Sequence, residues 1–592
     1  MLYPQQNEHR NLFPLDGIWD FRIDENDIGI KENWHEGFNN SRPIAVPSSW
    51  NELYPDTRDY IGVAWYQTKF KRPRLFKSGN LRLRFGAVTY KATIWLNGIL
   101  IGSHEGGFLP FEFNIDPTSQ LVDDNRLVVR VENELKPTRV PPGNVEGSKL
   151  SIFMSNQPAT NYDFFPYSGI HRSVVIYQVP KHNIADVTVN TSILGGKATV
   201  TVAGLTSNGG DEISFILKHE GTTVEKTTTV SRNRFNGAID VDNPHLWSTE
   251  TPYMYQLELF LKKSNEIIDS YYLDIGIRTI EVKDSKIILN GNPIELKGFG
   301  RHEDSSISGR GQNLPQSVQD HNLMTWIGAN SYRTAHYPYS EEDLTLADKN
   351  GFLVIDEIPA VGLSFEGNWA DVEERLDLCR QQISELIMRD KNHPSVIMWS
   401  IANEPFPPNL MERAMGQIND PIEPSTTDFL NTLIQDAKTL DETRPVSFAG
   451  VHGTPLDWLQ NVDVVMLNRY NGWYFDQLNL KEAIEKLSKE LDHIHSVIEK
   501  PIIISEFGAD TVAGLHAVSD ELYSEEYQVD LLKAYLDLAN SRDYLVGMHV
   551  WNLADFRTSH SMMRIGGLNR KGVFTRDRTP KMGAHFLRSR WT

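Results

Sequence analysis

Eight short apolar segments, separated by stretches suited to helices, constrain the fold of this chain more than any other feature. The segments lie near residues 294–299, 329–332, 352–355, 396–401, 446–449, 462–467, 501–504 and 546–550. Continuous apolar runs of this length are typical of parallel strands that are buried on both faces. One intervening stretch has the spacing of an amphipathic helix, with apolar residues at Val372, Leu376, Cys379, Ile383 and Leu386. Eight strands that alternate with helices predict a (β/α)8 TIM barrel over residues 281–592.

The first half of the chain is β throughout. The dipeptide Asn97-Gly98 between two apolar strands predicts a hairpin, because a type I′ turn needs positive φ at both central positions. The many short strands of residues 1–180 predict a sandwich or a jelly roll. Residues 181–280 are richer in Thr, Val and Lys, and their length is that of an immunoglobulin-like sandwich, although the usual Cys pair is missing. We therefore expect a multidomain β plus α/β protein.

The composition narrows the function classes. The 592 residues include 58 Lys and Arg against 78 Asp and Glu, which gives a net charge of −20. This charge disfavours sequence-independent binding of nucleic acid or of an anionic membrane. The single cysteine, Cys379, cannot form an internal disulfide, and neither a signal peptide nor a run of ~18 apolar residues is recognisable. We expect a cytoplasmic protein.

Polar residues stand at the carboxyl ends of most predicted barrel strands. They are Arg333 and His336, Asp356 and Glu357, Asn403 and Glu404, Asn468 and Tyr470, Glu506, and Trp551 with Asn552. The active sites of barrel enzymes lie at these ends of the strands. A buried carboxylate is also unfavourable unless it is paired with another group or has a functional role. The pattern predicts a catalytic site.

Glu404 and Glu506 support the sharpest hypothesis. They follow the fourth and seventh predicted strands, whose ends can point into one central cleft of a closed barrel. Two facing carboxyl groups are the minimum equipment for glycoside hydrolysis. The alternative for either residue is a structural ion pair with a nearby arginine such as Arg333.

A metal site is the competing interpretation of these strand ends. Its candidate ligands are His302, His336, His393, His549, Asp356 and Glu357. The sequence has no HExxH motif, and no two of these histidines have the short spacing of zinc ligands. His393 precedes the fourth strand, at the opposite face of the barrel. Because a P-loop and a Rossmann glycine pattern are also missing, we expect neither a metal nor another cofactor.

The stretches around both carboxylates resemble glycoside hydrolase family 2. They are SIANEP at 400–405 and IISEFG at 503–508, and the resemblance continues at 15–19, 163–172, 298–304, 329–339, 392–396 and 571–578. It implies a jelly roll, an immunoglobulin-like sandwich and a (β/α)8 barrel. It also implies a retaining mechanism in which Glu404 is the acid/base and Glu506 the nucleophile, with carboxyl groups about 5–5.5 Å apart.

The resemblance further implies how the sugar is bound. Asn569-Arg570-Lys571 matches the N-x-K motif with which members that hydrolyse β-D-glucuronides bind the C6 carboxylate. An ammonium and an amide are suitable donors for a carboxylate. The other substrate-binding residues that it implies are Asp163, His336, Asn403, Asn468, Tyr470, Tyr474, Trp551 and Arg564.

The sequence therefore predicts a retaining exo-glycosidase that acts on small-molecule or oligosaccharide β-glucuronides. By analogy with the family we expect a homo-oligomer, either a tetramer or a dimer. Another family 2 glycosidase, such as a β-galacturonidase or β-galactosidase, is an open alternative. A non-catalytic carbohydrate-binding protein is another, although a binding module does not need both Glu404 and Glu506.

Overall fold

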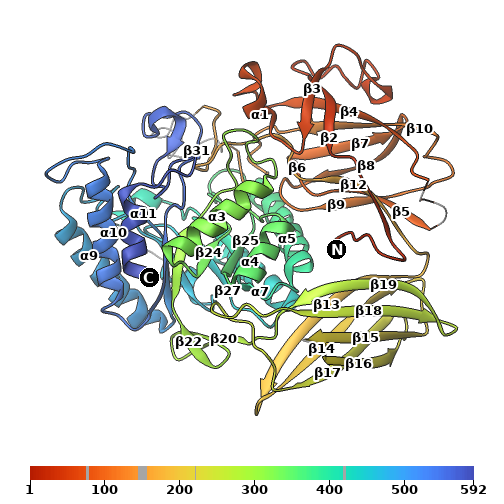
Figure 1. Ribbon diagram of the computed structural model, residues 1–592. Coiled ribbons are helices and arrows are strands. Elements are labelled where there is room, and N and C mark those ends of the chain that lie inside the picture. The colour runs from red at the N-terminus through yellow and green to blue at the C-terminus, as the bar shows by residue number, and fades with distance from the viewer. Residues whose placement is uncertain (75, 77–78, 144–156, 220–221, 418–421) are drawn as a thin grey trace.

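Two β-sandwiches precede a closed eight-stranded barrel in this computed structural model (Figure 1). The structure describes residues 1–592 except 75, 77–78, 144–156, 220–221 and 418–421. The predicted fold class is confirmed.

The first sandwich packs a six-stranded sheet, of order β3-β2-β4-β10-β7-β8, against a four-stranded sheet, of order β1-β12-β5-β9. Its elements are β1 (Asn11–Pro14), β2 (Gly17–Ile23), η1 (Trp34–Glu36), β3 (Arg42–Val46), α1 (Trp50–Leu53), η2 (Pro55–Thr57), β4 (Val63–Lys71), β5 (Asn80–Phe85), β6 (Val88–Thr89), β7 (Lys91–Leu96), β8 (Ile99–Glu105), β9 (Phe111–Ile115), β10 (Asp124–Glu132), β11 (Gly169–Ile170) and β12 (Val174–Val179). The predicted hairpin joins β7 and β8, and Asn97 and Gly98 have φ values of 54° and 80°.

The second sandwich faces a three-stranded sheet, β13-β14-β17, with a four-stranded sheet, β16-β15-β18-β19. Its strands are β13 (Asn183–Leu194), β14 (Lys197–Ser207), β15 (Glu212–His219), β16 (Thr222–Thr229), β17 (Arg234–Asp242), β18 (Tyr255–Lys263) and β19 (Glu266–Ile275). Alternate residues such as Val200, Val202 and Phe215 enter one core, as period-two strands require. A small sheet of β20 (Ile280–Lys283), β21 (Lys286–Leu289) and β22 (Asn292–Ile294) leads into the barrel.

The barrel strands follow the chain in order and close between the first and the last. They are β23 (Leu296–Gly300), β24 (Ser331–Arg333), β25 (Leu353–Glu357), β26 (Val396–Asn403), β27 (Val446–Gly450), β28 (Val465–Asn468), β29 (Ile502–Phe507) and β30 (Leu545–Val550). The remaining elements are α3 (Leu314–Ile327), α4 (Glu341–Asn350), α5 (Trp369–Asp390), α6 (Leu410–Ala414), α7 (Pro424–Leu440), α8 (Leu456–Leu459), α9 (Leu480–Ile498), α10 (Glu525–Ala539), β31 (Phe556–Arg557), η3 (Ile565–Gly567), β32 (Leu568–Asn569) and α11 (Met582–Trp591).

All eight predicted barrel strands are present, but several extend further than their apolar runs. Glu357, Asn403, Asn468 and Glu506 are strand residues, because neighbouring parallel strands continue the hydrogen-bonded ladder. The ladder shifts register between Ser400 and Asn403 and again next to Asn468 and Glu506. Such bulges redirect side chains, and here they occur where the polar residues begin.

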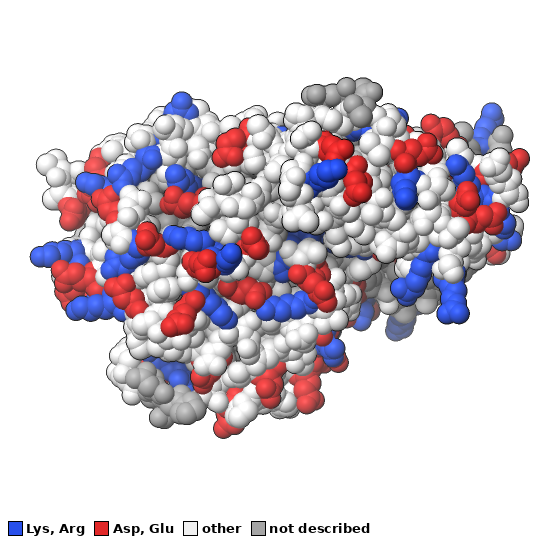
Figure 2. Space-filling model, turned by 90° about the horizontal axis from the view of Figure 1, so that it is seen from below, with Lys and Arg blue, Asp and Glu red and all other residues white. Residues whose placement is uncertain are grey.

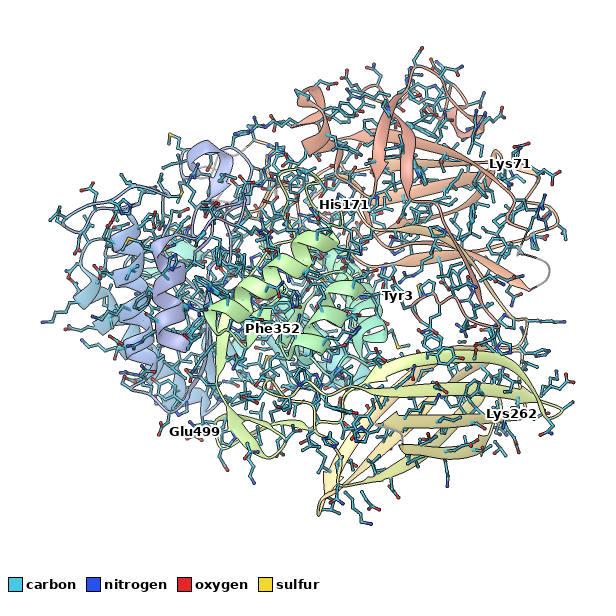
Figure 3. All side chains as sticks on the ribbon, in the orientation of Figure 1. Tyr3, Lys71, His171, Lys262, Phe352 and Glu499 are labelled. Carbon is cyan, nitrogen blue, oxygen red and sulfur yellow. The ribbon has the colours of Figure 1, made fainter. Side chains whose placement is uncertain are left out.

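The first sandwich is joined to the carboxyl-terminal face of the barrel by the segment 157–171. Gln157 N donates to the His560 carbonyl at 3.0 Å, and Phe165 N donates to the Arg557 carbonyl at 2.9 Å. His171, labelled in Figure 3, accepts a hydrogen bond at its own carbonyl from Gln312 N at 2.8 Å. The sandwich therefore contributes one wall at the end of the barrel where the polar residues gather.

None of the helices in the described part of the chain is long and apolar enough to cross a membrane.

Helix α5 has the predicted amphipathic character. The Asn368 side chain caps its first turn by accepting from Ala370 N at 3.2 Å. Val372, Cys379 and Ile383 on one face are buried against the barrel, so the interpretation of Cys379 as a core residue is confirmed.

We predict that the Cys379 thiol is unreactive in the folded protein. It is fully buried, and burial raises its pKa to about 12, so neither access nor thiolate is available. Iodoacetamide followed by intact-mass measurement should leave the native chain unmodified and add one label after unfolding in guanidinium. Rapid labelling of the native chain would contradict this placement.

Candidate active site

A buried arginine organises the carboxyl end of the barrel. Arg333, the last residue of β24, is fully buried. Its Nη1 donates to both oxygens of Glu357, at 2.8 and 2.9 Å, and its Nη2 donates to Oε1 of Glu506. Burial lowers the pKa of Arg333, but the two carboxylates raise it by more, so the guanidinium stays charged.

Glu506 is held by both charged and neutral donors. Besides Arg333, the Tyr470 hydroxyl donates to Oε2 at 2.7 Å, and His336 Nε2 lies 3.5 Å from Oε1. Trp551, which directly follows β30, stacks on the His336 ring with centroids 4.9 Å apart. These donors favour the ionised form, but burial and the charge of Glu404 outweigh them and raise the pKa of Glu506 to about 8.

Glu404 receives fewer donors. Its φ of 47° is uncommon for a residue with a side chain, and its N–H donates to the Ala449 carbonyl at 2.8 Å. Asn468 Nδ2 donates to Oε1 of Glu404 at 3.0 Å and to Oδ1 of Asn403 at 3.0 Å. A neutral amide therefore orients this carboxyl group without strongly favouring its charge.

The two carboxyl groups are coupled electrostatically. Burial raises the pKa of both Glu404 and Glu506, and the charge of Glu404 raises the pKa of Glu506 further. At Glu506, Arg333 and Tyr470 act in the opposite direction through direct hydrogen bonds. The pKa of both carboxyl groups is therefore raised, and the two groups titrate as a coupled pair.

A second polar group, which we call the lysine cluster, lies beside these carboxyl groups. Its members are Lys571, Asn569, Arg564, Tyr474, Asp510 and Asp163.

The centre of the lysine cluster is an ammonium group that is only 1% exposed, that of Lys571. Its Nζ donates to the Tyr474 hydroxyl at 2.8 Å and to Oδ2 of Asp510 at 2.5 Å. Burial raises the pKa of Asp510, but Lys571 and Arg564 outweigh burial and hold it below the ordinary value. Asp510 is therefore a carboxylate that compensates the buried cations.

Arg564 connects the lysine cluster to the first sandwich. Its Nε donates to Oδ1 of Asp163 at 2.9 Å, although the two residues are 401 positions apart. Asn569 Nδ2 donates to Oδ2 of the same Asp163 at 2.9 Å, and Asn569 Oδ1 accepts from Lys571 N at 3.1 Å. The cluster is thus complete only when the sandwich is docked on the barrel.

Tyr470 joins the two groups into one site. Its hydroxyl holds Glu506, and its ring centroid lies 5.5 Å from Lys571 Nζ and 5.2 Å from the Tyr474 ring. The Tyr470 side chain therefore lies between Lys571 and Glu506 and contacts both of them.

The structure brings every predicted site residue into these two groups. The ion pair between Arg333 and Glu506, which was the alternative to a catalytic glutamate, also forms. The strand-end pattern includes Glu357 without giving it a role, whereas Asp510 is not among the predicted residues. Glu357 carried the same signal as the other strand-end residues, and Asp510 stands four positions after Glu506.

The histidines considered as metal ligands do not form one group: His302 and His336 are neighbours, with ring centroids 5.6 Å apart, but His393 and His549 lie elsewhere. His393 lies before β26 and pairs with Asp348 at 2.6 Å, whereas His549 contacts Ser331 Oγ at 3.0 Å inside the barrel. His302 contacts the Tyr337 hydroxyl at 3.1 Å. Within the described ranges, no three His, Cys, Asp or Glu side chains are grouped so that they could hold a metal ion.

Comparisons with known proteins show which family the chain belongs to. The model "Glycosyl hydrolases family 2, TIM barrel domain" matches residues 280–592, the family's sugar binding domain matches 12–180, and a third model of the family matches 182–278. The chain belongs to glycosyl hydrolases family 2. The resemblance seen in the sequence is thereby confirmed.

Similar members of family 2 share one name. The β-glucuronidase of Paenibacillus borealis is 37% identical, with 100% of this chain and 98% of the relative covered, and that of Rattus norvegicus is 38% identical, with 100% and 92% covered. The solved structure of a Ruminococcus gnavus β-glucuronidase in complex with D-glucuronic acid is 36% identical. It superposes with a TM-score of 0.91 and covers 100% of this chain and 99% of that one.

We predict that Arg333→Met destabilises the family 2 barrel and abolishes activity. It would leave Glu357 and Glu506 buried without their cation, which costs about 3–5 kcal/mol. The thermal unfolding midpoint, measured by calorimetry, should fall by several degrees. The control is Arg380→Met, which removes a half-exposed ion pair with Asp436 and should cost less than about 1 kcal/mol. Equal effects of the two variants would contradict the assigned role of Arg333.

Proposed function

We propose that this chain is a retaining exo-β-glucuronidase that hydrolyses β-D-glucuronides to glucuronate and an aglycone. The observation that carries the proposal is the buried ammonium of Lys571 beside the carboxyl pair Glu404 and Glu506. The names of the relatives, and the D-glucuronic acid in the Ruminococcus gnavus structure, support it.

In the first step Glu404 donates its proton to the glycosidic oxygen. Its pKa is raised by burial, so the acid form is available. Glu506, whose carboxylate form is stabilised by hydrogen bonds from Arg333 and Tyr470, attacks the anomeric carbon in that form. The C–O bond to the aglycone breaks as the bond from Glu506 to the sugar forms.

In the second step the roles reverse. Glu404, now a carboxylate, removes a proton from water, and the resulting oxygen nucleophile attacks the anomeric carbon. The bond to Glu506 breaks and glucuronate is released with the anomeric configuration retained. This route needs carboxyl groups about 5–5.5 Å apart, and the chain requires no cofactor for it.

The lysine cluster receives the C6 carboxylate of the sugar. Lys571 supplies an ammonium, while Asn569 and Arg564 supply directional N–H donors. Asp163 and His336 contact sugar hydroxyls. Together with Asn403, Asn468, Tyr470, Tyr474 and Trp551, they complete the substrate-binding set.

We propose that the three domains have different roles. Residues 281–592 carry the catalytic residues, residues 1–180 contribute Asp163, and residues 181–280 support the barrel. The face in Figure 2 carries acidic and basic side chains interspersed rather than in a basic stripe, which supports the expectation that nucleic acid is not a partner. A homo-oligomer, tetramer or dimer, and a cytoplasmic location stay predictions.

We predict that substitutions of the two glutamates have different effects on the hydrolysis of p-nitrophenyl β-glucuronide. Glu506→Gln should lower kcat by roughly 10⁴-fold or more, because the nucleophile is lost. Wild-type kcat/KM should decline as the pH rises through the raised pKa of the acid, since Glu404 then loses its proton. Glu404→Gln should lack this alkaline decline and lose about 10²–10⁴-fold in rate. An unchanged alkaline limb in Glu404→Gln would assign the acid to another residue.

We predict that Lys571→Ala discriminates uronates from neutral sugars. Removal of the buried partner of a carboxylate costs about 2–5 kcal/mol, so kcat/KM on the β-glucuronide should fall by roughly 1.5 to 3.5 orders of magnitude. Activity on the matching β-glucoside, which has no carboxylate, should change less than about tenfold. Lys533→Ala on the exposed side of α10 is the control. Equal losses on glucuronide and glucoside would refute the proposed role, and the β-galacturonide in the same panel tests the nearest alternative activity.

A further inference from the structure

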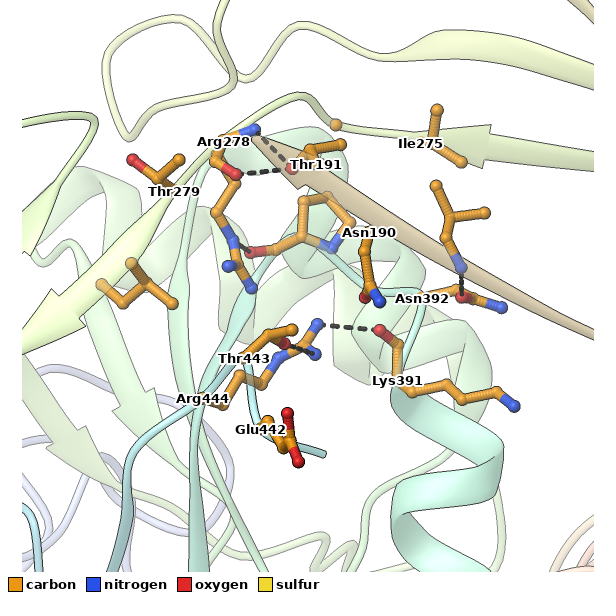
Figure 4. Close-up of a pocket in the computed structure, with 14 residues that line it drawn as sticks. Asn190, Thr191, Ile275, Arg278, Thr279, Lys391, Asn392, Glu442, Thr443 and Arg444 are labelled. Carbon is orange, nitrogen blue, oxygen red and sulfur yellow. Dashed lines mark hydrogen bonds between the residues drawn. The ribbon is translucent and has the colours of Figure 1, made fainter. Parts of the chain in front are cut away.

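A cavity of about 290 Å³ lies between the second sandwich and the amino-terminal face of the barrel (Figure 4). Its walls come from β13, from the segment that follows β19, and from the segments that precede β26 and β27. Its lining includes the polar and charged residues Asn190, Arg278, Lys391, Glu442 and Arg444. The cavity lies at the opposite end of β26 from Glu404, so it is separate from the active site.

Arg278 is the unusual group in this cavity. It is 7% exposed; its Nε donates to the Pro394 carbonyl at 3.0 Å and its Nη2 to the Val396 carbonyl at 2.8 Å. These contacts use two of its three nitrogens. Across the part of the chain that the structure describes, no carboxylate lies within 4.0 Å of this guanidinium and Nη1 has no hydrogen-bond acceptor.

The neighbouring cations are paired. Lys391 Nζ lies 2.8 Å from Asp186, and Arg444 Nη1 lies 2.7 Å from Asp441. Glu442 lies at the exposed rim and forms no ion pair within the described residues. Of these three cations, Arg278 is the one without a directly bound carboxylate among the described residues, although Asp441 and Asp348 act on it at longer range.

An uncompensated buried cation is unfavourable. Burial and the charge of Arg444 lower the pKa of Arg278 to about 9, and the more distant carboxylates Asp441 and Asp348 offset this only in part. An anion in the cavity would remove this penalty. The Asn190 side chain enters the same space from β13 (Figure 4) and, in the described structure, has no hydrogen bond of its own, so it can supply a second donor.

We propose that this cavity is a binding site for a small oxyanion, a sulfate, phosphate or carboxylate group, held by Arg278 Nη1 and the Asn190 amide. The exposed residues Asn190, Glu442 and Thr443 leave the cavity open to solvent. The bound anion joins β13 of the second sandwich to the segments before β26 and β27. It therefore stabilises the junction between the sandwich and the barrel.

The test uses sodium sulfate as the probe and the thermal unfolding midpoint as the readout. Sodium chloride at matched ionic strength is the reference, and every protein carries Lys571→Ala so that sulfate is not captured by the active site. Sulfate also stabilises proteins non-specifically, but that effect is common to all variants. The variants are Asn190→Asp, Arg278→Met, and the control Asn236→Asp on the exposed side of β17, which makes the same charge change elsewhere on the sandwich.

Sulfate should raise the midpoint by a few degrees more in the parent and in Asn236→Asp than in Asn190→Asp and Arg278→Met. Asn190→Asp places a carboxylate in the cavity and leaves the contacts of Arg278 with the barrel intact, so it keeps the test valid if Arg278→Met does not fold. Soaking crystals of the parent in selenate should give an anomalous peak beside Arg278 Nη1. An equal sulfate response in all four proteins, or no selenate at Arg278, would overturn the proposal.

Discussion

The buried guanidinium of Arg333 is the interaction on which the active site depends. An isolated carboxylate inside a barrel would be too unfavourable to persist. Arg333 contacts Glu357 and Glu506 at once, so the ends of β24, β25 and β29 can each carry a charge in one small volume. The same contact makes Glu404 and Glu506 unequal, since only Glu506 is bound by a cation. Unequal environments are what two glutamates need in order to act as acid and nucleophile.

In the lysine cluster, too, buried charges of opposite sign are paired, but here the cations are at the centre and the carboxylates compensate them. Lys571 and Arg564 are compensated by Asp510 and Asp163, so the cluster carries no net charge. Its donors are therefore held in place rather than free to reorient. This resolves an apparent conflict with the net charge of −20. The total charge describes the surface of the molecule, whereas a few buried donors set the local potential within the proposed site.

The barrel strands and the position of the candidate site could be predicted from the sequence, because both depend on local patterns of apolar and polar residues. Each apolar run predicted one barrel strand, and the polar residues next to each run predicted the position of the site. The strand ends and the motifs around them predicted Glu404, Glu506 and Lys571 as site residues. Asp510 could not be predicted, because its role is to pair with Lys571, which is 61 positions away in the sequence. The register shifts that place Asn403 and Asn468 were also missed, because a bulge is decided by the neighbouring strand.

The sequence by itself determined the order of two sandwiches and a barrel, since apolar periodicity is a property of short segments. It also determined which residue types stand at the strand ends. The tertiary structure alone decided how charges are paired, because partners such as Asp163 and Arg564 are 401 residues apart. It also decided that Arg278 has no carboxylate partner among the described residues. Charge pairing depends on distances in space, and sequence distance does not report them.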